Sequence, residues 1–395
     1  MPTRLTSGTD ARAEALHALN ILDTPREERF DRIVRTARNI FNVPMAAVNL
    51  VDTDRQWTKA EIGLPGPEDT PLEEAICPQT VRQGTLLVVP DASEDERFRN
   101  IPSVAGDPHI RFYAGQPLRA PGGEPVGSLC ILDTEPRELD DREAKVLADM
   151  AEWVERELSL QQEMDHAAEV QRVLLPRTVP ALPGYELAAR CVPSAAIGGD
   201  FYTWHTLPDG RLQLHVADVM GHGIPAALIA ASVRAMLSGA AQFNSQADTV
   251  HKAAAGAEQL LSDTGSFVTL FSARLDPATG TLEYVDAGHG LAFIFGGDGY
   301  CRLSQSGPPV GILPDQRWDL HRTVLEPGET LVIVSDGFLD FFPTLEETLQ
   351  QALAAGLPAL PPAELVARAI SFTNASGQQD DVTVVALRRC AAPAG

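Results

Sequence analysis

Aspartates at the ends of strand-like runs carry the most informative chemistry in this chain. Asp218 closes the run 212–217, and Asp336 closes the run 331–335. One aspartate in such a place is usually a turn former. A group of them in one half of a chain, most of them beside glycine or a second aspartate, predicts a shared acidic site. The candidates are Asp200, Asp218, Asp336 and Asp380, the last followed directly by Asp381.

This pattern favours metal chemistry on a phosphate ester. Carboxylates that converge repel one another unless protons or cations lie between them. Their oxygens suit hard cations such as Mn²⁺ or Mg²⁺ better than zinc. Two such ions lower the pKa of a shared water and hold a phosphoryl group. We therefore expect a site that uses two Mn²⁺ or Mg²⁺ ions.

Two histidines stand beside glycines in the same half of the chain. His222 lies in the turn 218–223, and His289 ends the run Asp286-Ala-Gly-His289. Either could act as a general acid near a leaving oxygen. Histidines in such loops more often hydrogen-bond a turn, and both interpretations stay open at this point.

The second half of the chain alternates strand-like runs with Gly, Asp and Pro turns, which predicts sheets covered by helices in an α/β sandwich. Helices are expected at 223–240, 247–262, 344–355 and 362–374. Strands are expected at 185–193, 211–217, 267–275, 281–287, 291–295, 330–335 and 382–388.

The first half predicts a separate α+β domain. Residues 9–41 read as two helices broken at Asp23-Thr24-Pro25, with Pro25 at a first helical turn. Cys77 and Cys130 are either ligand or redox contacts or buried structural residues. Strands are expected at 44–51, 86–89, 110–119 and 125–132.

A long helix is expected between the two halves, because residues 139–175 contain neither glycine nor proline. Apolar residues recur at heptad spacing from Val146 through Met150 and Leu160 to Leu174, which favours a two-stranded coiled coil and a homodimer. The alternative is a helix that packs back on its own domains.

Composition narrows the function classes. The formal net charge of −23 over 395 residues disfavours nucleic acid as a partner, because positive charge supplies most of that affinity. Five widely spaced cysteines argue against a disulfide framework and for a reducing cytoplasm. The sequence contains no run of about 18 uninterrupted apolar residues, so no membrane span is expected. The start of the chain does not look like a secretory signal.

The second half resembles the PPM-type phosphatases of the sporulation and sigma-factor-regulating branch. The segments that carry this resemblance run in order over residues 168–388. They are Gln171-Arg-Val-Leu-Leu-Pro176, Ile197-Gly-Gly-Asp-Phe-Tyr202, Ala217-Asp-Val-Met-Gly-His-Gly223, Gly265-Ser-Phe-Val-Thr269, Asp286-Ala-Gly-His289, Ser335-Asp-Gly337 and Asp380-Asp-Val-Thr383.

The resemblance implies hydrolysis of phosphoserine or phosphothreonine by activated water, without a phosphoenzyme. It implies that Asp218 bridges the two ions with help from the Val219 carbonyl. Asp336 and Asp380 would be the other principal ligands. Asp200 would contact the ions either directly or through another ligand. Asp381 is the alternative to Asp380 if the register of the last strand is off by one residue. The expected substrate is a phosphorylated STAS-type anti-sigma-factor antagonist.

Two other functions compete with this one. Thr203 stands where the family often has another aspartate, so a catalytically weak, ligand-controlled binding module remains an alternative. Gly198-Gly-Asp-Phe201 also superficially resembles a diguanylate cyclase signature, although Phe201 replaces its glutamate.

The first half resembles the GAF family of small-molecule sensors over residues 12–158. The resemblance rests mainly on Asn20-Ile-Leu-Asp-Thr24, Arg55-Gln-Trp57, Asp95-Glu-Arg-Phe98 and Gly127-Ser-Leu-Cys-Ile-Leu-Asp133. It implies a central antiparallel sheet and an unidentified small-molecule ligand. We expect a GAF domain at 1–145, a helical linker at 146–175 and a phosphatase domain at 176–390.

Overall fold

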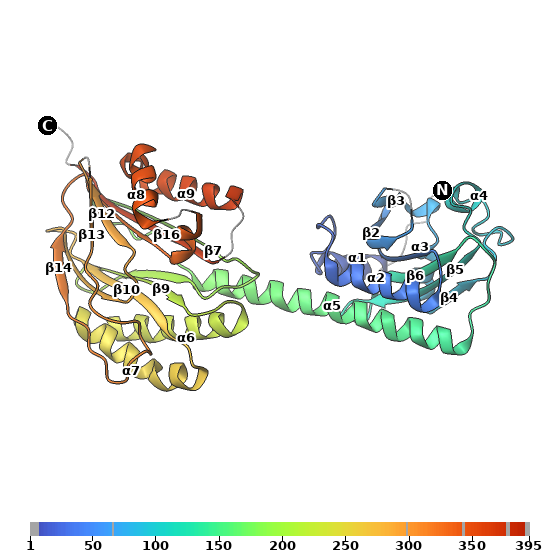
Figure 1. Cartoon of the computed structure of the whole chain (residues 1–395), viewed down its shortest axis with the longest axis horizontal. Coiled ribbons are helices and arrows are strands. Elements are labelled where there is room, and N and C mark those ends of the chain that lie inside the picture. The colour runs from blue at the N-terminus through green and yellow to red at the C-terminus, as the bar shows by residue number, and fades with distance from the viewer. Residues whose placement is uncertain (1–7, 65–66, 298, 342–343, 377–379, 392–395) are drawn as a thin grey trace. The chain divides into compact units, whose positions relative to one another are not determined.

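The computed structural model describes residues 8–64, 67–297, 299–341, 344–376 and 380–391. The chain divides into two compact units, Met1–Asp165 and His166–Gly395. Each unit has its own hydrophobic core. Figure 1 shows the helices and strands of both units.

The N-terminal unit is built on a six-stranded antiparallel sheet with the order β3-β2-β1-β6-β5-β4. Its strands are β1 (Met45–Val51), β2 (Arg55–Ile62), β3 (Asp69–Pro71), β4 (Leu87–Val89), β5 (Phe112–Arg119) and β6 (Pro125–Asp133). Helices α1 (Gly8–His17), α2 (Glu28–Phe41) and α5 (Asp141–Leu174) cover one face. The short helices α3 (Cys77–Gln83) and α4 (Pro102–Ala105) contribute to the core on the other face. The predicted α+β domain and its four predicted strands are confirmed, while β2 and β3 were not predicted.

Strand β1 is buried on both faces because both faces of the sheet are covered. Val48 and Leu50 contact the core on the side of α2 and α5, whereas Met45 and Ala47 contact the core on the side of α3. A strand between two cores reads as a continuous apolar run, which is how the sequence predicted it.

The prediction for Pro25 was wrong, because helix α2 begins only at Glu28. Lys59 explains the difference. Its buried ammonium donates to the Thr24 hydroxyl at 2.7 Å and to the Pro25 carbonyl at 2.8 Å, and it pairs with the Glu27 carboxylate at 2.6 Å. Buried charges need such partners, and meeting them keeps residues 24–27 out of the helix.

Helix α5 is confirmed, but the first half of its apolar stripe packs within its own unit. Leu147, Met150, Val154 and Leu158 are buried in the core that also contains α2 and the sheet. Met150 is therefore a core residue rather than part of a free dimer seam. Leu160 is 55% exposed, and Val170 is 60% exposed.

The C-terminal unit is a sandwich of two five-stranded antiparallel sheets, so the predicted architecture is confirmed. The first sheet has the order β14-β11-β10-β9-β8, and the second has the order β13-β12-β15-β16-β7. The strands of the first sheet are β8 (Phe201–Thr206), β9 (Leu212–Val219), β10 (Val268–Leu275), β11 (Thr281–Ala287) and β14 (His321–Val324). Those of the second are β7 (Tyr185–Val192), β12 (Ala292–Gly296), β13 (Gly299–Arg302), β15 (Thr330–Val334) and β16 (Val382–Arg389).

Helices cover both outer faces of this sandwich (Figure 1). Helices α6 (Ile224–Ala241) and α7 (Gln246–Thr264) pack on the first sheet, whereas α8 (Leu345–Ala354) and α9 (Pro362–Ser376) pack on the second. The four predicted helices are confirmed. Among the described residues, α6 alone is long and apolar enough to pass a test for a membrane span. Its Ile229, Val233 and Leu237 pack in the core beside β9.

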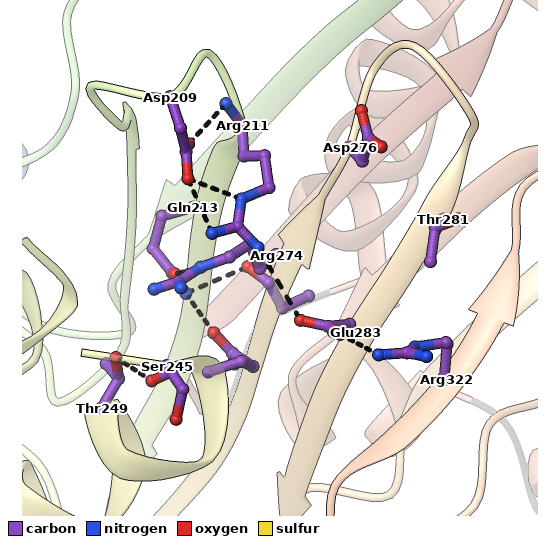
Figure 2. A network of polar contacts seen from close by, with 12 residues as sticks. Asp209, Arg211, Gln213, Ser245, Thr249, Arg274, Asp276, Thr281, Glu283 and Arg322 are labelled. Atoms are coloured by element: carbon purple, nitrogen blue, oxygen red, sulfur yellow. Dashed lines mark hydrogen bonds and ion pairs between the residues drawn. The ribbon is translucent and has the colours of Figure 1, made fainter.

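A buried arginine fixes the C-terminal end of α6 to the first sheet. Arg274 of β10 is 3% exposed and donates to the carbonyls of Ala241 and Asn244 and to the Gln213 side chain. Figure 2 shows this arginine beneath the surface pair Asp209–Arg211. Arg274 therefore fixes the C-terminal end of α6, and the N-terminal end of this helix directly follows residues 218–223, which include Asp218.

Candidate active site

Strand ends from both sheets meet at one edge of the sandwich. In the first sheet, Asp200 precedes β8 and Asp218 lies near the end of β9, and these strands pair through Phe201 and Ala217. In the second sheet, β15 and β16 pair antiparallel, so that Asp336 follows one strand where Asp380 precedes the other. The Ser335 hydroxyl donates to the Asp381 carbonyl at 3.2 Å, which joins these two ends.

Asp381 links the two sheets by holding the loop that leads to Asp200. One carboxylate oxygen of Asp381 accepts from the Ser194 backbone N–H at 2.8 Å and from the Ser194 hydroxyl at 3.0 Å. The other accepts from the Gly199 N–H at 2.6 Å and from the Asp200 N–H at 3.4 Å. Both oxygens of this buried carboxylate are thus engaged by protein donors. Asp381 has the environment of a positioning residue, whereas Asp380 is exposed to solvent.

Gly198 and Gly199 allow this close approach. A Cβ at Gly198 would lie 2.1 Å from a carboxylate oxygen of Asp381, and one at Gly199 would lie 2.7 Å from the Val219 carbonyl oxygen. Neither separation is possible for a real side chain. The glycine pair is therefore what lets the 194–200 loop lie against both Asp381 and the end of β9.

A residue of α5 holds the same loop from another side. The Gln171 side-chain amide donates to the Gly198 carbonyl at 2.6 Å, and its oxygen accepts from the Gly198 N–H at 3.1 Å. Sequence reasoning missed this role of Gln171, and also the role of Ser194. The only signal for Gln171 was its place in the segment Gln171–Pro176, which gave no indication of a contact with Gly198.

The carboxylates at this edge disfavour one another's charge. Burial, and then the negative charges of Asp336 and Asp380, raise the pKa of Asp218 to about 7. Burial, and then the charge of Asp218, raise the pKa of Asp200 well above its ordinary range. One oxygen of Asp200 is buried without a hydrogen-bond partner.

These observations fit a site for hard cations. An unpartnered buried carboxylate oxygen, mutually repelling aspartates and a nearby backbone carbonyl are a donor set for Mn²⁺ or Mg²⁺. Within the part of the chain that the structure describes, no three Asp, Glu, His or Cys side chains already form a metal-coordinating group. The ligand set Asp200, Asp218, Val219, Asp336 and Asp380, with Asp381 as the alternative to Asp380, remains a prediction.

The two candidate histidines differ in their surroundings. His289 is buried, and its Nδ1 lies 3.3 Å from the Thr269 hydroxyl, opposite Asp218 in the sheet. Its backbone N–H donates to the Asp286 carboxylate, and its Nε2 is buried without a hydrogen-bond partner. Burial lowers the pKa of His289 to about 4, so its ring is neutral. His222 is exposed in the acidic loop.

Thr203, where the related phosphatases often have a further aspartate, lies inside strand β8. It is 5% exposed and stands opposite His215 of β9. It therefore lies away from the strand ends that carry the acidic group.

Two known families match this chain. The family described as stage II sporulation protein E (SpoIIE) matches residues 208–390, and the GAF domain family matches residues 25–158. The chain thus contains a GAF domain and, after it, a SpoIIE-type domain. The SiaA-PP2C domain of Pseudomonas aeruginosa superposes with a TM-score of 0.52 and 21% identity, covering 58% of this chain and 96% of that chain. That similarity shows the fold of the SpoIIE-type domain.

Two curated relatives represent different activities. Phosphoserine phosphatase RsbU of Bacillus subtilis is 28% identical over 181 residues, which cover 45% of this chain and 53% of that protein. Cyclic di-GMP phosphodiesterase PA2567 of Pseudomonas aeruginosa is 39% identical over 137 residues, which cover 34% of this chain and 23% of that protein. The chain thus spans about half or less of the lengths of these relatives.

Proposed function

We propose that this chain is a GAF-regulated, metal-dependent protein phosphatase that hydrolyses phosphoserine or phosphothreonine. The observation that carries the proposal is that Asp218 feels the charges of Asp336 and Asp380 from the other sheet, while Asp200 beside it has one buried carboxylate oxygen without a hydrogen-bond partner. The SpoIIE family match and the similarity to a protein named phosphoserine phosphatase support it.

The chain's own residues would divide the work as follows. Asp218, the Val219 carbonyl, Asp336 and Asp380 would hold two Mn²⁺ or Mg²⁺ ions, and Asp200 would complete the set from the loop. When bound, the ions activate water and neutralise the phosphoryl oxygens. Asp381 would keep Asp200 in place through the Ser194 and Gly199 amides rather than touch the substrate.

Hydrolysis of a generic aryl phosphate by the full chain tests the proposal. Turnover should appear with Mn²⁺ or Mg²⁺ and vanish with excess EDTA. Asp218→Asn and Asp336→Asn should each reduce turnover by orders of magnitude. Asp209→Asn is the matched control, because Asp209 is a surface residue whose carboxylate pairs with Arg211 (Figure 2).

Three outcomes would overturn the assignment. Full turnover in EDTA would remove the metal from the mechanism, and equal behaviour of the three variants would place the site elsewhere. A folded chain with no phosphatase activity under any metal would favour the weak binding module. GTP is the comparison substrate, since its cyclisation would support the cyclase alternative.

The protein substrate follows from the resemblance to the sigma-factor-regulating branch. We propose a phosphorylated STAS-type anti-sigma-factor antagonist in the cytoplasm. With a net charge of −23, the chain repels an acidic protein over long range, and salt screens that repulsion. Hydrolysis of an acidic phosphoprotein should therefore not slow as salt rises. A steep fall with salt would indicate a basic partner instead.

We further propose that the GAF domain acts on the phosphatase through the helix, with the domains at 1–145, 146–175 and 176–390 and with a homodimer as the assembly. Helix α5 reaches from the core of the first unit to Gln171, which holds Gly198. The fragment from residue 166 onward, which is a compact unit, should lose sensitivity to a GAF ligand. Retained sensitivity in that fragment would contradict the regulatory role.

A further inference from the structure

A cavity of about 390 Å³ opens in the GAF domain on the α3 side of the sheet. Its floor consists of residues from β1, β2, α3, β5 and β6, and its mouth lies among residues of the segments 61–64, 67–76 and 102–108. The volume falls at the small end of the range that is usual for small-molecule sites. The cavity lies wholly within the N-terminal unit, so it can be considered independently of the phosphatase.

Most polar groups on the floor are already paired with one another. The Asn49 amide donates to the sulfurs of Cys77 and Cys130 at 3.3 and 3.4 Å, and its oxygen accepts from the Thr58 hydroxyl at 2.8 Å. The Tyr113 hydroxyl lies 2.7 Å from the Thr80 hydroxyl. These side chains are satisfied without any ligand.

Gln56 is the exception. Its side chain lines the cavity and is 8% exposed, and its amide oxygen is buried without a hydrogen-bond partner. A buried acceptor that is left unpaired costs free energy, whereas one that meets a donor from a ligand stabilises the complex. The cavity therefore contains one acceptor that awaits a donor.

The mouth of the cavity is acidic. Glu68, Glu74 and Asp107 are exposed there, and no basic side chain of the described residues forms an ion pair with them. Among the described residues that line the cavity, Arg26 alone is basic, and it is already paired with Glu61 at 3.0 Å and with Asp31 at 3.1 Å. An anion entering here would meet uncompensated negative charge.

We propose that this cavity binds a small organic cation that carries N–H donors, and that it rejects anions such as nucleotides and carboxylates. One N–H donates to the Gln56 oxygen, while the positive charge is stabilised by the acidic mouth. The proposal assigns a ligand class to the GAF domain and does not depend on the phosphatase activity.

Three probes of one shape and different charge test the proposal on the full chain. Benzamidine is a cation with N–H donors, benzamide is neutral with N–H donors, and benzoate is an anion without them. Ligand-observed NMR titration up to millimolar concentration should rank benzamidine above benzamide, with benzoate not binding. Benzoate binding as strongly as benzamidine would overturn the proposal.

Variants of Gln56 locate the binding. Gln56→Leu removes the acceptor at similar size and should weaken benzamidine and benzamide by about five-fold or more. Gln56→Glu adds negative charge beside the donor and should strengthen benzamidine relative to benzamide, so the two variants act in opposite directions. Thermal unfolding verifies that each variant folds. Unchanged benzamidine affinity in both folded variants would show that the probe binds elsewhere.

Variants of the mouth separate the local field from the net charge. The triple variant Glu68→Gln, Glu74→Gln and Asp107→Asn should weaken benzamidine about five-fold and leave benzamide nearly unchanged. The control variant Glu94→Gln, Glu96→Gln and Glu138→Gln removes the same charge from exposed positions that do not line the cavity. Equal effects of the two triple variants would refute selection by the acidic mouth.

Discussion

Replacing Gln171 by leucine should weaken metal binding without removing any proposed metal ligand. Gln171 makes two hydrogen bonds to the backbone of Gly198, which is buried two residues before Asp200. Leucine fills a similar volume but offers neither donor nor acceptor. The buried N–H and carbonyl of Gly198 would then each lose a hydrogen-bond partner, with no water to replace it.

The size of the effect can be worked from those two bonds. A buried polar group left unpaired costs about 1–3 kcal/mol, so the pair costs roughly 2–6 kcal/mol if nothing relaxes. The loop can relax, because Ser194, Ala195 and Ala196 are exposed. We therefore expect about 1.4–2.8 kcal/mol to appear as lost metal affinity, which is roughly a 10- to 100-fold weakening.

Calorimetric titration of Mn²⁺ into the full chain measures this loss directly, and aryl phosphate turnover across a range of Mn²⁺ concentrations gives an independent measure. Because Gln171 touches the loop and not Asp218 or Asp336, saturating Mn²⁺ should restore most of the turnover. Gln162→Leu is the matched control. It makes the same substitution earlier in α5, and the hydrogen bonds described for Gly198 come from Gln171 instead.

Two results would refute this reasoning. If Gln171→Leu and Gln162→Leu bound Mn²⁺ equally well and unfolded at the same temperature, the bonds to Gly198 would contribute nothing to the site. If affinity were unchanged but saturating turnover were lost, Gln171 would act in the chemistry rather than through the loop.

Two further predictions concern the paired aspartates and the assembly. Asp381→Asn should lower the free energy of unfolding by about 2 kcal/mol, because an amide NH₂ would face backbone donors. Asp380→Asn should leave the stability unchanged and reduce turnover. Thermal unfolding and the aryl phosphate assay measure both effects, and the reverse pattern would make Asp381 the ligand. Leu160→Glu should weaken a dimer at tens of micromolar in analytical ultracentrifugation. The control Val179→Glu should not, although Val179 is also apolar and is 52% exposed. A wild-type monomer at that concentration would refute the dimer.

The strand ends were predictable from the sequence because the signal is local. An apolar run that stops at Asp218 or Asp336 marks both the strand and the place where its carboxylate emerges. The antiparallel sheets then bring these ends to one edge. The sequence could therefore predict the strand ends and their carboxylates, whereas the meeting of these ends at one edge depends on the strand pairing.

The different roles of Asp380 and Asp381 could not be predicted, because they depend on register. Adjacent residues at a strand start point to opposite sides, and only the position of the 194–200 loop decides which side is occupied. That loop reaches Asp381 across more than 180 residues of chain. No local pattern carries this information.

For a related reason, the sequence could not decide between the two packings expected for α5. A heptad pattern shows that one stripe of the helix is apolar but does not show what covers the stripe. In the structure, the domain's own sheet covers Leu147 and Val154, with Met150 beside them. Further along the helix, where that sheet no longer lies against it, Leu160 and Val170 are exposed.

The positions of Asp200 and Asp218 indicate which of the two aspartates a regulatory movement could displace. Asp218 lies on a strand buried between the inter-sheet core and the core under α6, so it cannot shift without disturbing both. Asp200 is different, because its loop is held by Asp381 from one side and by Gln171 from the other. A small displacement of α5 would change the second hold and leave the first intact. We therefore expect regulation through the helix to alter how well Asp200 completes the cation site, and so to change metal affinity more than turnover at saturating metal.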